Sequence, residues 1–261
     1  MKRIWLLIRL LCAPALMGLA PSPDAATPGA AAPRLSQECA APFESALHGP
    51  SLNQLATALE TRHDFDVLAI GSTSMLGPVG LPRDAFTYRA IDFLAASHPG
   101  TKITLVPRTA RGALATDMLA TLQNELAAHQ YPLVFWQAGS VEALRSIPVD
   151  DFRRTLSEGA KLVREAHGSL ILIDAQYSRL MNSKVDVAPY ESVMHEVALA
   201  SGVTLFPRFD LTREWVNSSR IDLERASQGE RQKTADHLNE CLGKALATIM
   251  GSDTDPAPFS K

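Results

Sequence analysis

Short runs of apolar residues alternate along the chain with longer segments in which apolar residues recur at helical spacing. The runs are nearly continuous in Val, Ile and Leu: "DVLAIG" (66–71), "KITLVP" (102–107), "PLVFWQ" (132–137), "SLILIDAQ" (169–176) and "VTLFPR" (203–208). Such runs are typical of strands buried on both faces of a parallel sheet. The helical spacing predicts helices near 84–97, 113–129, 149–167 and 188–201, and a closing helix near 235–250.

This alternation of strands and helices predicts an α/β fold, a flavodoxin-like three-layer α/β/α sandwich with a five-stranded parallel sheet. Right-handed crossovers would place helices on both faces of the sheet. Ligands of such folds bind at the edge where the strands end, here called the carboxyl edge. The sequence shows no internal repeat, and the pattern suits a single domain.

The composition fits one substantial core and narrows the classes of partner. Of the 261 residues, 46% are hydrophobic and 20% are charged, which argues against disorder. The formal net charge of -3 provides no basic surplus, so nucleic acid is not an expected partner.

The N-terminus has the features of a secretory signal. Lys2 and Arg3 precede the apolar stretch "LLCAPALMGLA" (10–20), and small residues follow. We assign 1–26 to a signal peptide, 27–37 to a Pro/Ala-rich linker, 38–250 to the domain and 251–261 to a flexible tail. Because Arg9 and Pro14 interrupt the apolar run, we expect cleavage, no stable membrane span, and a periplasmic or secreted protein. The alternative is an uncleaved anchor.

Two cysteines, Cys39 and Cys241, remain after the predicted signal peptide is removed. A leftover pair in an oxidising compartment indicates a disulfide. The alternative is a pair of buried free thiols, and the geometry decides between the two.

Polar residues follow four of the predicted strands, as "GSTS", "PRTARG", "WQAGSVEAL" and "DAQYSR". Their order resembles that of the SGNH/GDSL hydrolases, a flavodoxin-like esterase family, over about 38–250. "AIGSTSMLG", "FWQAGS" and "DAQY" are similar to "IGSSSTAG", "WQVGTN" and "PQY" of exported bacterial members. The resemblance implies the SGNH hydrolase fold, ester-cleaving chemistry, and acylated glycans or lipids as ligands.

The catalytic parts that the resemblance implies are altered in this chain. The family's nucleophilic serine falls on Thr73, with Ser72 and Ser74 on either side. A threonine hydroxyl is more crowded, although threonine nucleophiles exist. The alternative is a turn whose hydroxyls bond to the backbone.

The positions implied for oxyanion donors are altered too. The oxyanion glycine falls on Thr109, whose backbone amide could still donate. In the third block Gly139 matches, but the asparagine falls on Val141, which has no side-chain donor.

The position of the general base is open between two alignments. One places the family's Asp-x-x-His on 230–233, "ERQK", which contains no imidazole. The other takes His237 as the base, which puts Thr234 where the orienting acid belongs. Neighbouring residues on a helix point about 100° apart, so Asp236 would not hold the ring of His237. The alternative places Asp236 and His237 in an exposed first turn of the closing helix, where the helix dipole favours Asp.

Further candidates lie at the predicted carboxyl edge. Arg108, Trp136, Gln137, Asp174, Gln176 and Tyr177 could line a pocket or belong to hydrogen-bonded turns. In "FPRFDLTREW" (206–215), Arg208 and Arg213 could bind a sugar or an anion, but a surface ion-pair face is the commoner outcome. No histidine pair has metal-ligand spacing and no Gly-rich loop could hold a phosphate, so we expect no metal and no cofactor.

Because all four implied catalytic addresses are altered, the leading hypothesis is an exported SGNH/GDSL-family protein with little or no esterase activity. It would act as a binding or scaffolding module of the cell envelope for acylated glycan or lipid. The first alternative is an active acyl-ester hydrolase that uses Thr73 or Ser72 with His237, its acid supplied from elsewhere, possibly by Glu230. A third hypothesis, a module that binds an anionic small molecule at "GSTS", needs no base.

Overall fold

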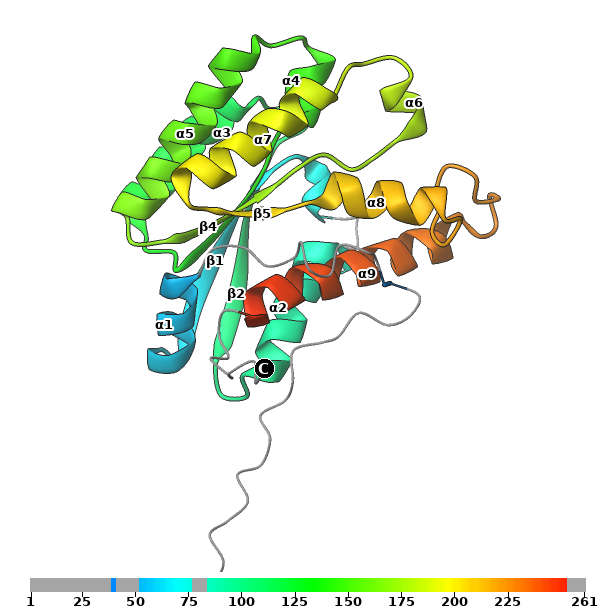
Figure 1. Cartoon of the computed structure of the whole chain (residues 1–261). Helices are drawn as coiled ribbons and strands as arrows, with labels where there is room; N and C mark the ends of the chain where they lie inside the picture. The colour runs from blue at the N-terminus through cyan, green and yellow to red at the C-terminus, as the bar shows by residue number, and fades with distance from the viewer. Residues whose placement is uncertain (1–38, 41–51, 77–83, 253–261) are drawn as a thin grey trace, which may run out of the picture.

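The sheet has the predicted architecture in the computed structural model, which describes residues 39–40, 52–76 and 84–252. The strands are β1 (Asp64–Gly71), β2 (Lys102–Thr109), β3 (Leu133–Gln137), β4 (Ser169–Ile173) and β5 (Thr204–Phe206). They form one five-stranded sheet in the order β2-β1-β3-β4-β5, with every neighbouring pair parallel (Figure 1). The prediction of an α/β fold with a five-stranded parallel sheet is therefore confirmed.

Helices cover both faces of this sheet. α3 (Ala115–Ala128), α5 (Val149–Glu165) and α7 (Ala188–Ser201) pack on one face. α1 (Asn53–Thr61), α2 (Phe86–Ser97) and α9 (Arg231–Ser252) contribute to the core on the other, where α2 and α9 lie side by side (Figure 1). The result is the three-layer sandwich that the alternating pattern predicts.

Each strand supplies both layers of the core because successive side chains point to opposite faces. On β1, Val67 and Ala69 belong to the core under α2 and α9, whereas Leu68 and Ile70 belong to the core under α3 and α5. All four side chains are fully buried. Burial on both faces explains why the strand sequences are continuously apolar.

The region after β5 differs from the prediction. The strand ends at Phe206, and residues Arg208–Asn217 form a helix, α8, that we did not predict. Pro207 has no N–H to donate to the sheet and suits a helix start, which accounts for the change. The short elements η2 (Thr73–Leu76), α4 (Ser140–Leu144) and α6 (Arg179–Asn182) also follow strand ends.

The closing helix begins earlier than predicted, at Arg231 instead of near 235. Ser227 and Glu230 help to begin it, since the Ser227 hydroxyl donates to Glu230 Oε2 at 2.8 Å and the Arg231 N–H donates to Ser227 O at 2.9 Å. Asp236 and His237 therefore lie in its second turn and are half-buried, not in an exposed first turn. None of the helices in the described residues is long and apolar enough to cross a membrane.

A disulfide joins Cys39 and Cys241, as predicted, across 202 positions of the chain. Both cysteines are buried, and the Trp215 indole donates to the Cys39 carbonyl at 3.3 Å. The bond ties the N-terminal arm to α9. The predicted signal peptide and linker lie outside the described residues, as does the tail beyond Ser252.

Candidate functional site

The predicted hydroxyl turn meets the end of the neighbouring strand. The hydroxyl oxygens of Ser72 and Ser74 are 2.7 Å apart, and each lies 3.2 Å from Gln137 Oε1. Gln137 is the last residue of β3 and only 4% exposed, and its Nε2 lies 3.1 Å from the Ser74 hydroxyl. Two hydroxyls and one amide thus form a polar cluster at the carboxyl edge of the sheet.

Gly71 permits this close approach. A Cβ at this position would lie 2.5 Å from Met75 Sδ and 2.8 Å from Gln137 Cβ. Only glycine therefore lets η2 fold back onto the strand ends without displacing its neighbours. The glycine of "AIGSTSMLG" therefore has a clear steric role.

The side-chain partner of these hydroxyls on β3 is a neutral amide. A nucleophilic serine or threonine needs a neighbouring base that takes its proton. The Gln137 carbonyl oxygen accepts a hydrogen bond, but a neutral amide is not a base at physiological pH. Thr73 occupies the position that the resemblance assigns to the nucleophile. It is exposed, and no hydrogen bond joins its side chain to another described residue.

Most of the described histidines lie at the opposite edge of the sheet from the hydroxyl turn at 72–74. Six of the seven fall in the described residues. Four of these sit at strand starts or helix ends, at the opposite edge of the sheet: His63, His98, His129 and His167. The other two, His195 and His237, belong to α7 and α9. Among the described residues, no hydrogen bond connects an imidazole to the hydroxyls of 72–74.

His237 lies beside the disulfide, with Nε2 3.9 Å from Cys241 Sγ. It lines a cavity of about 1020 Å³ between α9 and the loop that follows α8. Glu230 and Lys233, at the other Asp-x-x-His address, line the same cavity, whereas no described residue of 72–74 does. Among the described residues, His237 and the hydroxyls of 72–74 thus share neither this cavity nor a hydrogen bond.

The amide of Gly139 is already engaged. Gly139 has a φ of +100°, and its N–H donates to Glu142 Oε2 at 2.8 Å. Oε1 of the same carboxylate accepts from the Ala115 N–H at 2.6 Å, and Glu142 is only 1% exposed. This carboxylate holds the N-termini of α3 and α4, and sequence reasoning missed it. The signal was a glutamate three residues after the N-cap Gly139, which is capping-box spacing.

The two candidates on β2 have separate surroundings. Thr109 is aligned with Gly71 in the sheet and ends β2 beside the hydroxyl turn. Arg108, one residue earlier, points to the opposite side and pairs with Glu125 of α3 at 2.5 Å. The hydrogen bond to Glu125 is the main reason that the pKa of Arg108 is raised.

Arg208 is buried, so the expected surface ion-pair face is wrong at this position. It is only 2% exposed, and its guanidinium carbon lies 4.8 Å from the centre of the Phe86 ring. Its Nη2 donates to Gln176 Oε1 at 2.6 Å, whereas Nε and Nη1 have no hydrogen-bond partner among the described residues. Burial lowers the pKa of Arg208 to about 10, which leaves it charged at neutral pH. Arg213 does form the expected surface pair, 2.6 Å from Asp210.

Tyr177 contributes backbone and ring contacts near the same place. Its N–H donates to Thr212 Oγ1 at 2.9 Å, and its ring meets Phe209 edge to face at 5.5 Å. The "DAQY" segment is thus held against α8 by both of its last two residues.

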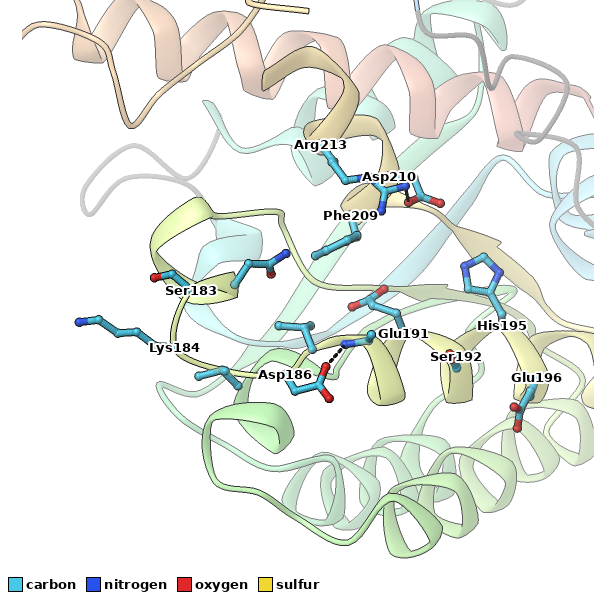
Figure 2. Close-up of a pocket in the computed structure, with 14 residues that line it drawn as sticks. Ser183, Lys184, Asp186, Glu191, Ser192, His195, Glu196, Phe209, Asp210 and Arg213 are labelled. Atoms are coloured by element: carbon cyan, nitrogen blue, oxygen red, sulfur yellow. Dashed lines mark hydrogen bonds and ion pairs between the residues drawn. The ribbon is translucent and has the colours of Figure 1, made fainter. Parts of the chain in front are cut away.

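A second polar cavity, of about 810 Å³, lies between α7, α8 and the loop after α6. Figure 2 shows Glu191 and His195 projecting from α7 towards α8, which carries Phe209, Asp210 and Arg213. Sequence analysis did not identify Glu191. In the described residues, no group of three or more His, Cys, Asp or Glu side chains could hold a metal ion.

Glu191 interacts electrostatically with Asp174, a fully buried carboxyl group that accepts from the Phe209 N–H at 2.8 Å. Loss of hydration on burial raises the pKa of Glu191 to about 7. Burial, followed by the charge of Glu191, also raises the pKa of Asp174. Burial and mutual repulsion between two carboxyl groups both favour the protonated form.

The fold is one that solved structures of SGNH-type hydrolases share. The family model described as the Non-GDSL lipase-like family matches residues 38–254. The chain belongs to this family, which confirms the predicted relationship to SGNH/GDSL hydrolases. No match was found among curated protein sequences.

Solved structures of esterases share the fold at low sequence identity. A G-D-S-L family protein from Desulfitobacterium hafniense DCB-2 is 14% identical, with a TM-score of 0.54, and the match covers 70% of this chain and 98% of that one. A catalytic mutant of the acetylxylan esterase Axe2 from Geobacillus stearothermophilus is 15% identical, with a TM-score of 0.57 and coverage of 71% and 94%. The two-domain esterase CEX, active on acetylated mannans, is 11% identical, with a TM-score of 0.64 and coverage of 82% and 57%.

Proposed function

We propose that this protein is an exported SGNH-fold member of the cell envelope with little or no esterase activity. It acts as a binding or scaffolding module for acylated glycan or lipid. The observation that carries the proposal is the partner of the serine hydroxyls. Ser72 and Ser74 bond to each other and to the Gln137 amide, which cannot take a proton from them.

Two further observations support the proposal. His237 lines a cavity to which none of the residues 72–74 contributes, and the Gly139 amide donates to Glu142. A site without a base and without these donors loses several of the contributions that accelerate acyl transfer. We propose acylated ligands because the chain belongs to a lipase-like family and shares its fold with esterases.

The proposal is tested by assaying hydrolysis of p-nitrophenyl acetate by the purified protein. Three variants serve as matched comparisons: Ser72→Ala, Thr73→Ala and His237→Ala. We expect the wild-type rate to equal that of all three variants and of an inert protein at the same concentration. A wild-type rate about 100-fold or more above that of Thr73→Ala or Ser72→Ala, with a similar loss in His237→Ala, would instead establish the active hydrolase.

A further inference from the structure

A small cavity of about 170 Å³ lies beside Gln176, between α8, α9 and the loop that joins them. Much of its wall is apolar: Val216, Ile221, Leu223 and Leu238. Since Gln176 closely follows the end of β4, the cavity is at the carboxyl edge of the sheet. None of the described residues of 72–74 lines it.

Several polar groups in the wall are already bonded within the protein. The Ser178 hydroxyl donates to Glu224 Oε1 at 2.5 Å. Thr212 Oγ1 accepts from the Tyr177 N–H at 2.9 Å and donates to the Arg208 carbonyl at 2.7 Å. These groups have little capacity left for a ligand.

The amide nitrogen of Gln176 is different. Arg208 Nη2 donates to Gln176 Oε1 at 2.6 Å, and a guanidinium has no acceptor, so the amide oxygen must face the arginine. The NH₂ group is thereby turned away from Arg208, and no hydrogen bond joins it to another described residue. Gln176 thus offers two N–H donors in a fixed orientation.

The buried charge of Arg208 adds to this polarity. Arg208 is 2% exposed, and its Nε and Nη1 have no hydrogen-bond partner in the part of the chain that the structure describes. In such surroundings a positive charge is weakly screened and attracts the negative end of a carbonyl dipole.

We propose that this cavity binds the short acyl group of an acylated ligand, with the apolar wall around the alkyl part and Gln176 Nε2 donating to the ester carbonyl. A water molecule occupies about 30 Å³ in the liquid, so the cavity has room for about five or six heavy atoms. That number fits acetyl to butyryl groups, whereas an octanoyl chain would have to extend beyond the cavity. The inference rests on the proposed function and narrows its ligand class. An acyl group held here is bound away from the hydroxyls, so binding does not lead to cleavage.

Saturation-transfer NMR of the purified protein tests the inference. The probes are 6-O-acetylglucose, 6-O-butyrylglucose and 6-O-octanoylglucose, with glucose as the unacylated control. We expect the acetyl and butyryl protons to receive saturation, and octanoylglucose and glucose to bind at least tenfold more weakly.

Two variants address the cavity directly. Leu223→Trp fills it, and we expect at least a tenfold loss of acetylglucose affinity. Gln176→Glu keeps a partner for Arg208 but removes both donors, and one lost hydrogen bond corresponds to a loss of about tenfold. Ser183→Trp, which places the same bulk in the cavity of Figure 2, should leave the affinity unchanged.

The outcomes separate this inference from the proposed function. Octanoylglucose binding as tightly as acetylglucose, or binding that Leu223→Trp leaves intact, would overturn the short-acyl cavity but not the binding of acylated ligands. Release of free acetate or butyrate in the same samples, suppressed in Thr73→Ala or Ser72→Ala, would overturn the proposed function. Absence of binding by all three esters would contradict the inference as well.

Discussion

The carboxyl pair of Asp174 and Glu191 predicts that the protein is less stable at pH 8 than at pH 5. Burial raises the pKa of Glu191 from 4.5 to about 7. The folded state therefore holds a proton that the unfolded chain has released, and the folded state loses this advantage as the pH rises from about 4.5 to 7. Each pKa unit corresponds to about 1.4 kcal/mol, so the loss is up to about 3 kcal/mol.

The substitution Glu191→Gln isolates this contribution because an amide cannot ionise. At pH 5 the variant and the wild type should unfold with similar free energies, whereas at pH 8 the variant should be more stable by up to about 3 kcal/mol. The charges that also act on Glu191, Asp210 and Arg213, are present in both proteins. Urea unfolding at the two pH values measures the difference.

The control is Glu196→Gln on the same helix, where the exposed carboxylate forms a surface ion pair with Arg153. Its difference from the wild type should be small and nearly equal at both pH values. If the difference between Glu191→Gln and the wild type is also the same at pH 5 and pH 8, the raised pKa of Glu191 is refuted.

Three further predictions concern stability. Replacing Cys39 and Cys241 by alanine should lower the free energy of unfolding by about 2–5 kcal/mol, measured by urea unfolding, because the bond closes a loop of about 200 residues; an unchanged midpoint would contradict it. Gly159→Ala should lower the thermal midpoint despite the better helix propensity of alanine, because the new Cβ would lie 1.9 Å from Trp136 Cζ3; a raised midpoint would refute this packing. Glu142→Ala should cost about 1–3 kcal/mol in urea unfolding by leaving two backbone amides without their acceptor, and a cost near zero would refute that role.

The fold could be predicted from the sequence because strands that are buried on both faces of a sheet have a recognisable, continuously apolar sequence. Each strand is apolar without interruption, and the helices between the strands have the length and spacing that crossovers need. The hydroxyl turn after β1 was predictable for the same reason, since its position depends only on where that strand ends.

The partners of the site residues could not be predicted in this way. Arg208 looked like a surface cation because the apolar run 203–208 was taken as a strand that includes it. The sequence did not show that α8 would carry the guanidinium between Phe86 and Gln176. The burial of Glu191 could not be predicted either. A polar residue on an amphipathic helix is expected to face solvent, and the sequence does not show that Asp174 lies near it.

The central claim is that the hydroxyls at the end of β1 are not activated as nucleophiles. Fluorophosphonates react with activated serine or threonine hydroxyls and add a fixed mass to the protein. We predict that the intact mass of the wild-type protein stays unchanged after hours with excess reagent. A single adduct on the wild type that is absent from Ser72→Ala or Thr73→Ala would contradict the account.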